Sequence, residues 1–238
     1  EAVRRLGFDD VYEVALGADM VAYDEAAELS EKGFLTSSCC PAFVKYLEKQ
    51  MPQMLEYKSH NLSPMAALGK HIKEREPDTA VVFIGPCIAK KSEIMREEVR
   101  PYIDCVLTFE ELQALLDSRD IDLGELEERP LDDASYYGRV FARTGGLAEA
   151  VARALKEQGS DFELKAVSCD GIEQCRAALM KASKNVLGGN FIEGMACTGG
   201  CIGGAGCLTH GVRNRSDIDR YAKQAGDKGI FEAIRQAD

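Results

Sequence analysis

The sequence predicts an α/β protein of two lobes, in which parallel sheets are flanked by helices and a cofactor cleft lies between the lobes. Continuous apolar, β-branched runs such as 79–85 (TAVVFIG) are typical of buried parallel strands. Segments with helical periodicity separate these runs, and strands that alternate with helices form parallel sheets. Ligands of such sheets bind beyond the carboxyl ends of the strands, so the loops that follow the strands are the candidate sites.

The N-terminal half begins with helix-like residues and continues into alternating elements. In order, we expect a helix at 2–8, a strand at 10–15, a helix at 18–32, a loop at 34–41, helices at 42–54 and 63–74, and a strand at 79–85. Gly33 provides a helix stop. Pro41 and Pro64 each stand in a first helical turn, where proline is tolerated because its missing N–H has no helical partner.

The C-terminal half continues the alternation of strand and helix. In order, we expect a strand and a threonine-capped helix within 104–117, a helix at 146–158, a strand at 162–169, a helix at 171–183 and a strand at 191–197. Residues 118–138 are polar and rich in turn formers. They predict a boundary between lobes 1–125 and 126–238.

Composition excludes several classes of protein. The chain has 238 residues, 45% of them hydrophobic and 29% charged, which is ordinary for a folded domain. A net charge of -11 disfavours a surface that follows nucleic-acid phosphates. No apolar run is long enough for a membrane span, and the first residues carry no signal-peptide core. We therefore expect neither a nucleic-acid partner nor a membrane partner.

Nine cysteines are the unusual feature of the composition. An odd number does not suit a fully paired disulfide framework, and such frameworks belong to small secreted chains. The sequence therefore predicts a cytoplasmic protein whose thiols stay reduced and bind metal or carry chemistry.

Four cysteines from separate segments could together hold one iron–sulfur cubane, because such clusters take four thiolates. They are Cys40, Cys87, Cys197 and Cys201. Glycines between 199 and 206 let the backbone approach a bulky inorganic group. A zinc site is less favoured because Cys87 has no near partner in the sequence. Cys39 and Cys40 are adjacent, so we expect one to be a ligand and the other to act differently. A vicinal dithiol that is redox-active or merely buried is the alternative.

Three segments together resemble the catalytic domain of the iron-only (FeFe) hydrogenases. They are 37–41 (SSCCP), 85–93 (GPCIAKKSE) and 193–206 (EGMACTGGCIGGAG). Two further segments resemble the same family less closely, namely 106–116 (VLTFEELQALL) and 138–151 (GRVFARTGGLAEAV). The resemblance covers nearly the whole chain, so it implies one catalytic domain over 1–238. The chain begins inside what resembles the family's first helix, so we expect a fragment of a longer protein.

The resemblance implies an H-cluster, which is a four-iron four-sulfur cubane bridged to a two-iron subsite with CO, cyanide and azadithiolate. By position, Cys40, Cys87 and Cys197 would hold the cubane and Cys201 would bridge it to the subsite. Lys90 would hydrogen-bond a cyanide, with Met195 and Pro86 beside the cofactor. Cys39 would pass protons to the cofactor's amine, and Glu93 of the second motif belongs to the implied catalytic set.

Protons also need a path between the cofactor and solvent. Glu25 and Glu28 match the family's pair of glutamates, and their spacing of three places both on one helix face. Ser63, followed by proline, matches the serine–proline pair of the family. We expect a relay of Cys39, a water, Glu25, Ser63, Glu28 and solvent; without the resemblance, solvated surface glutamates would be the favoured interpretation.

The chain departs from the family pattern at several positions. Gly85 replaces the methionine before Pro86 and would open space beside the subsite, and Phe43 replaces a tryptophan. Cys207 and His210 stand where the pattern has glutamine and proline. The remaining cysteines are expected to be small buried apolar residues: Cys105, Cys169 and Cys175.

The leading hypothesis is reversible reduction of protons to hydrogen. The alternatives are a hydrogen-sensing regulatory module and a non-catalytic iron–sulfur protein of the same fold. No ferredoxin-like run of cysteines is present, so electrons would come from a ferredoxin-like donor or from missing iron–sulfur domains. Cofactor maturation proteins are further implied partners, and an anaerobic setting fits the resemblance.

Overall fold

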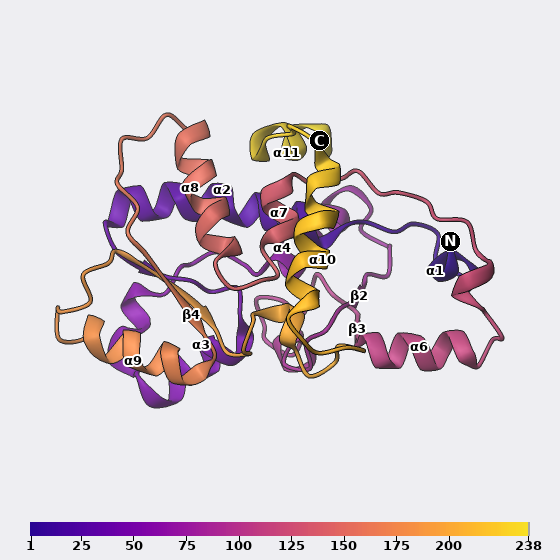
Figure 1. Ribbon diagram of the computed structural model, residues 1–238, viewed down its shortest axis with the longest axis horizontal. Helices are drawn as coiled ribbons and strands as arrows, with labels where there is room; N and C mark the ends of the chain where they lie inside the picture. The colour runs from indigo at the N-terminus through magenta and orange to yellow at the C-terminus, as the bar shows by residue number, and fades with distance from the viewer. Residues whose placement is uncertain (238) are drawn as a thin grey trace.

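Helices and short parallel strands alternate along the chain in the computed structural model, which describes residues 1–237 (Figure 1). The α-helices are α1 (Ala2–Arg5), α2 (Val14–Lys32), α3 (Pro41–Gln50), α4 (Pro64–Arg75), α5 (Lys90–Glu93), α6 (Phe109–Asp117), α7 (Tyr136–Val140), α8 (Gly146–Glu157), α9 (Ile172–Ala182), α10 (Arg213–Ala222) and α11 (Ile230–Ala237). The strands are β1 (Leu35–Thr36), β2 (Val82–Ile84), β3 (Cys105–Leu107), β4 (Ala166–Asp170) and β5 (Phe191–Met195). The α/β fold class is confirmed.

The strands form two small sheets, and every pairing in them is parallel. One sheet has the order β1-β5-β4, with Leu35 opposite Phe191 and Ala166 opposite Phe191 on the other side. The other consists of β2 and β3, with Val82 opposite Cys105. Because parallel strands end at the same edge of a sheet, the loops after β1 and β5 emerge side by side.

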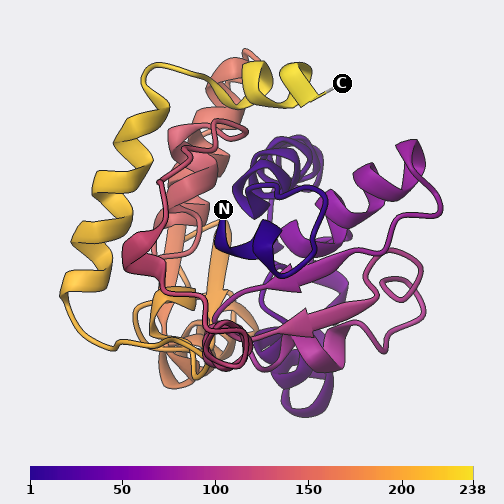
Figure 2. The same ribbon diagram turned by 90° about the vertical axis from the view of Figure 1, so that its right-hand side faces the viewer.

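Helix α2 is the central element of the packing. It buries Ala22, Ala26 and Leu29 completely, and its contacts include α4, α7, α8 and α11. Figure 2 views α2 nearly along its axis, with helices of the C-terminal half on one side and α4 on the other. Gly33 ends α2 in the left-handed conformation (φ 78°), which glycine adopts without a Cβ clash.

Most predicted elements are confirmed, but the strand expected at 10–15 is wrong. Residues 10–13 have no regular structure, and Val14 and Ala15 belong to the first turn of α2. Glu13 is only 7% exposed and forms an ion pair with Arg139 at 2.8 Å. The apolar alternation there reflects contacts of an extended segment and a helix start, not a strand.

Two other expectations need correction. The helix expected at 42–54 ends at Gln50, and Pro52 starts a 3-10 helix over Pro52–Tyr57. Strand β2 is half-buried, not buried. The first sheet combines β1 from the N-terminal side of residue 125 with β4 and β5 from the C-terminal side, and the division into lobes 1–125 and 126–238 stays a prediction.

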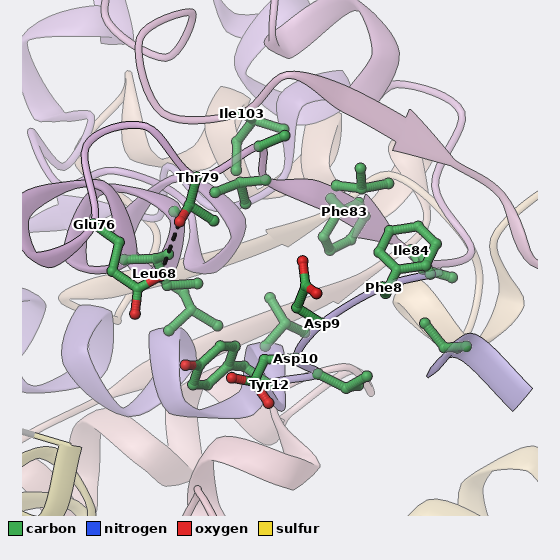
Figure 3. A pocket seen from close by; sticks show the side chains of 18 of the residues that line it. Phe8, Asp9, Asp10, Tyr12, Leu68, Glu76, Thr79, Phe83, Ile84 and Ile103 are labelled. Atoms are coloured by element: carbon green, nitrogen blue, oxygen red, sulfur yellow. Dashed lines mark hydrogen bonds between the residues drawn. The ribbon is translucent and has the colours of Figure 1, made fainter. Parts of the chain in front are cut away.

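A groove of about 1060 Å³ runs between β2 and the extended segment after α1 (Figure 3). Phe8 and Tyr12 line one side, and Leu68, Phe83 and Ile103 line the other. None of the cysteines lines this groove. Across residues 1–237, no helix is long and apolar enough to cross a membrane.

Candidate functional site

The four candidate ligand cysteines converge from three loops that follow strands. Cys40 caps the start of α3 after β1, and Cys87 follows β2. Cys197 and Cys201 follow β5. The charge on Cys40 raises the pKa of each of the other three thiols, so all four lie within electrostatic reach of one another. The sequence-based grouping therefore corresponds to a real spatial cluster.

Burial raises the free energy of ionising Cys87, Cys197 and Cys201 when no cation is nearby. Desolvation is the largest cause of the raised pKa of Cys87, Cys197 and Cys201, and the neighbouring thiols add to it. All nine cysteines are free. Thiolate is the form that binds metal, so a positively charged iron–sulfur core would compensate the energetic cost of ionising them.

The cluster is spread too widely for a single metal ion. Within residues 1–237, no three His, Cys, Asp or Glu side chains stand close enough to hold one ion. A cubane distributes its four thiolates over four iron atoms, so its ligands need not meet at one point. The donor set of four cysteines therefore fits a cubane better than it fits zinc.

Glycines let the loops of Cys87 and Cys201 pack directly on each other. A Cβ at Gly204 would lie 2.4 Å from the carbonyl oxygen of Pro86, and one at Gly203 would lie 2.0 Å from that of Thr198. The N–H of Gly206 donates to Pro86 O at 3.0 Å. This contact joins the glycine-rich segment to the loop after β2 and places Pro86 at the edge of the cysteine cluster.

Lys90 is a buried cation beside the thiols. It is 7% exposed and donates through Nζ to Glu93 Oε2 at 2.6 Å and to Cys39 O at 3.2 Å. Burial alone would lower the pKa of Lys90, but the Glu93 carboxylate and the sulfurs of Cys87 and Cys39 outweigh it and raise the pKa. Glu93 therefore positions and charges the lysine, whose N–H groups lie against the cysteine loops.

Cys39 differs from its neighbour in its surroundings. It is 8% exposed and packs in the core with Ala22, Ala26 and Met195. Burial, followed by the charges of Glu25, Cys40 and Cys201, raises its pKa well above the usual range. Cys39 is thus a protonated thiol between the cysteine cluster and a buried carboxyl group.

Glu25 is that buried carboxyl group. It is fully buried on α2, and neither of its carboxyl oxygens has a hydrogen-bond partner within the described chain. Desolvation and the charge of Glu28 raise its pKa to about 8, so it holds a proton at neutral pH. Ser59 lies near enough to counteract this shift, although its hydrogen bond goes to Glu28.

Ser59 is the link that sequence reasoning missed. Its hydroxyl is fully buried and donates to Glu28 Oε2 at 2.8 Å. The predicted Ser63 instead caps α4, where its Oγ accepts from Ala66 N at 3.4 Å. A serine preceding proline carries the signature of a helix cap, whereas no local pattern marks Ser59. The hydrogen bonds therefore favour Ser59 over Ser63 between the two glutamates.

Glu28 forms the outer end of this line. Burial tends to raise its pKa, but hydrogen bonds from Lys32, Ser59 and the backbone of His60 outweigh it, and the pKa is lowered. Lys32 Nζ donates at 2.6 Å. The neighbouring carboxyls thus differ in protonation state, with Glu25 neutral and Glu28 ionised, which is the arrangement needed to hand a proton along.

Glu193 and Met195 show how β5 is held at the site. Glu193 is fully buried and accepts from Gly145 N at 2.8 Å, Ala148 N at 3.2 Å and Ser168 Oγ at 2.7 Å. A carboxyl group at the N-terminus of α8 is favourably placed against the helix dipole. Met195, 2% exposed, ends the strand directly before the cysteine loop.

The departures at Gly85 and Phe43 both involve aromatic rings. A Cβ at Gly85 would lie 2.6 Å from Cζ of Phe83, so the Phe83 ring occupies the space that loss of a side chain was expected to open. A Cβ at Gly194 would lie 2.5 Å from the Phe43 ring. Phe43 is therefore packed face-on against β5.

The remaining cysteines divide into exposed and buried ones. Cys169 and Cys175 are buried, as expected, whereas Cys105 is exposed on β3, so that expectation is wrong. Cys207 is buried and its charge acts on Cys197, which places it near the cluster. His210 is exposed.

Comparison with known proteins points to one family. The model of the family described as iron only hydrogenase large subunit, C-terminal domain, matches residues 1–205. The NADP-reducing hydrogenase subunit HndD of Solidesulfovibrio fructosivorans is 31% identical over 283 residues, which cover 94% of this chain and 48% of that protein. Protein NAR1 of Arabidopsis thaliana is 26% identical over 276 residues, 86% of this chain and 58% of that protein.

A solved structure shares the fold. A glutamate-to-alanine variant of the FeFe-hydrogenase HydA1 from Chlamydomonas reinhardtii superposes with a TM-score of 0.78 at 23% identity, covering 99% of this chain and 80% of that chain. The chain spans about half of the length of the curated relatives it matches.

Proposed function

The chain belongs to the iron-only hydrogenase large-subunit family, and from that membership we propose that it reversibly reduces protons to hydrogen at an H-cluster. The observation that carries the proposal is Cys39, a buried, protonated thiol that stands between the cysteine cluster and the neutral carboxyl group of Glu25. A protein that only stores a cubane needs four ligands and has no use for this fifth thiol or for the buried carboxyl behind it.

In a hydrogenase, the residues of this site would bind the cofactor and surround it. Cys40, Cys87, Cys197 and Cys201 would hold the cofactor through their thiolates. When bound, the H-cluster supplies redox-active iron and a basic amine. Lys90, oriented by Glu93, offers buried N–H donors to an anionic ligand. Met195, which is 2% exposed, and Pro86 would lie beside the cofactor.

Proton movement is assigned to the chain's own groups. Cys39 Sγ holds a proton at the inner end, and Glu25 holds the next one. Ser59 Oγ donates to Glu28 Oε2, and a hydroxyl can accept a proton from one side as it gives one to the other, so Ser59 would pass protons from Glu25 to Glu28. A neutral Glu25 beside an ionised Glu28 lets a proton move in either direction, as a reversible reaction requires.

Relatives also favour a second candidate, a non-catalytic iron–sulfur protein. The cytosolic Fe-S cluster assembly factor NAR1 of Kluyveromyces lactis is 37% identical over 91 residues of this chain. A hydrogen-sensing module is a third use of the same site. Both keep the cubane, so ligand cysteines alone do not separate them from the hydrogenase.

Infrared spectroscopy combined with turnover separates these candidates. We expect protein matured with the full cofactor to show CO and cyanide bands and to evolve hydrogen from reduced viologen. Cys39→Ala should keep the bands and lose turnover by about 100-fold or more, because the inner proton donor is gone. Cys40→Ala should lose cubane iron. A matured protein without CO bands would establish the non-catalytic candidate, and bands with only trace turnover would favour the sensor.

The partners and the compartment follow from the same proposal. Electrons would come from a ferredoxin-like donor or from iron–sulfur domains outside this sequence, and maturation proteins would install the two-iron subsite. We place the protein in the cytoplasm, where nine free thiols would stay reduced.

A further inference from the structure

Cys39, Glu25, Ser59 and Glu28 form a line of mostly buried groups that leads outward from the cysteine cluster. The outer end of this line meets solvent at His60. Its Nδ1 lies 3.1 Å from Glu28 Oε1, and its backbone N–H lies 3.2 Å from both carboxylate oxygens of the same residue. The His60 side chain is 76% exposed, whereas that of Glu28 is 12% exposed. The imidazole therefore connects open solvent to a carboxylate that solvent barely reaches.

Neighbouring groups fix this contact. Ser59 Oγ donates to Glu28 Oε2 at 2.8 Å and Asn61 Nδ2 donates to the same atom at 3.1 Å, so the segment 59–61 surrounds the carboxylate. A cavity of about 410 Å³ opens beside it, lined among others by His60 and Asn61. This cavity offers room for water at the solvent end of the line.

One nitrogen of His60 has two partners with opposite requirements. Lys32 Nζ lies 3.0 Å from Nδ1 and can only donate to it, so this contact needs an unprotonated Nδ1. Glu28 Oε1 can only accept, so that contact needs a protonated Nδ1. The two contacts correspond to the ring before and after it gives up its Nδ1 proton.

We propose that His60 loads protons from solvent onto Glu28, a role that rests on the proposed hydrogenase function. The neutral ring, protonated at Nδ1, takes a proton at Nε2 from hydronium or a buffer acid. The imidazolium N–H bond at Nδ1 then breaks as an O–H bond forms at Glu28 Oε1. The ring is left neutral with its proton at Nε2, and Lys32 donates to the vacated Nδ1. Hydrogen oxidation runs these steps in reverse.

The charges around His60 suit this exchange. Glu28 and Lys32 face the ring from α2, and Lys58 acts on Glu28 from the adjoining segment. Asp24 of α2 and Lys70, His71 and Glu74 of α4 line the cavity. The His60 ring has two nitrogens, and Nδ1 contacts Glu28, so the ring can take up a proton at Nε2 and release one at Nδ1.

The first test measures hydrogen evolution by matured protein in dilute buffer without nitrogen bases. We expect His60→Gln to lower the rate at least about fivefold near neutral pH and added imidazole to restore it, because a free base replaces the missing ring. His210→Gln, on an exposed loop, is the matched control and should keep the wild-type rate. An unchanged His60→Gln rate, or a loss that imidazole does not restore, overturns the proposal; an inactive wild type overturns the hydrogenase function instead.

A second readout needs no cofactor. The 15N resonance of His60 Nδ1 in the cofactor-free chain of residues 1–238 reports whether that nitrogen is protonated and hydrogen-bonded. We expect Glu28→Gln to shift the His60 Nδ1 resonance toward the position of the His210 resonance. The His210 resonance itself should be the same in the wild type and in Glu28→Gln. If Glu28→Gln leaves the His60 signal in place, the contact does not govern the ring and the proposal fails.

Discussion

The hydroxyls of the two candidate relay serines have different hydrogen-bond partners. Ser59 Oγ donates to Glu28, whereas Ser63 Oγ accepts from the backbone of α4. We expect Ser59→Ala to lower hydrogen turnover by about tenfold or more, because the hydroxyl between the glutamates is lost. Ser63→Ala should cost about 1 kcal/mol of stability through the lost helix cap. Turnover and urea unfolding of both variants check this, and a larger turnover loss for Ser63→Ala would return the relay to Ser63.

At the residue scale, the sequence predicted those groups whose chemistry is tied to a local pattern. Cys40, Cys87 and Cys201 each stand in a recognisable motif, and the structure brings their thiols within electrostatic reach of one another, whereas their roles as ligands stay a prediction. Ser59 and His60 carry no such pattern, because only the fold brings them to Glu28: Ser59 stands 31 positions after Glu28 in the sequence. Gly85 was misjudged for the same reason, since Phe83, which fills its space, is a neighbour whose ring direction the sequence does not state.

At the scale of single elements, α2 buries two carboxyl groups whose ionisation opposes folding. Asp19 is fully buried and accepts from Ser135 N at 2.8 Å and Ser135 Oγ at 2.6 Å at the start of α7. Desolvation outweighs these bonds and raises its pKa to about 7. The folded state therefore binds a proton that the unfolded state has released between about pH 4 and 7. Stability from this group is present below about pH 4 and is lost as pH rises through 7.

This linkage can be measured by urea unfolding of the apo chain between pH 4 and 8. We expect Asp19→Asn to reduce the fall of the unfolding free energy with pH by up to about 1.4 kcal/mol per pH unit, the value for one proton. Ser135→Ala should keep the fall of the unfolding free energy with pH and extend it to higher pH. The reason is that this substitution removes hydrogen bonds that favour the ionised Asp19 carboxylate. Identical slopes for wild type and Asp19→Asn would contradict the assignment.

Element prediction succeeded where apolar period and cap agreed. Thr108 and Glu111 form the expected threonine-capped start of α6, with both bonds of a capping box present. Prediction failed at 10–15, where apolar and polar residues do alternate. Glu13 in this segment binds Arg139 and Tyr221, which are more than a hundred residues away in the sequence, so local alternation did not indicate its structure. The final helices, α10 and α11, were not predicted, because the last segment carries few apolar residues outside one narrow face.

At the scale of the whole molecule, the cysteine cluster is where the two sheets meet. Cys40, Cys197 and Cys201 follow strands of the β1-β5-β4 sheet, whereas Cys87 alone follows the β2-β3 sheet. The α/β class was predictable from alternating elements. The sharing of strands across residue 125 was not, because β1 is only two residues long and pairs with a strand at 191–195. A bound cubane would add covalent links between sheets that otherwise meet through loops and helices.

This arrangement predicts that cluster binding stabilises the β2-β3 sheet through Cys87. Reconstitution of the cubane under anaerobic conditions should raise the unfolding free energy by about 4 kcal/mol when the cluster is present at a thousand times its dissociation constant. Amide hydrogen exchange should slow in both sheets, since a shared ligand set opposes local opening. In Cys87→Ala we expect residual iron to protect the β1-β5-β4 sheet but not Val82–Ile84 and Cys105–Leu107. Cys105→Ala, on the exposed face of β3, is the control and should match wild type; equal protection of β2 in Cys87→Ala and wild type would mean that the loop packing around Gly204, not the ligand, joins the two sheets.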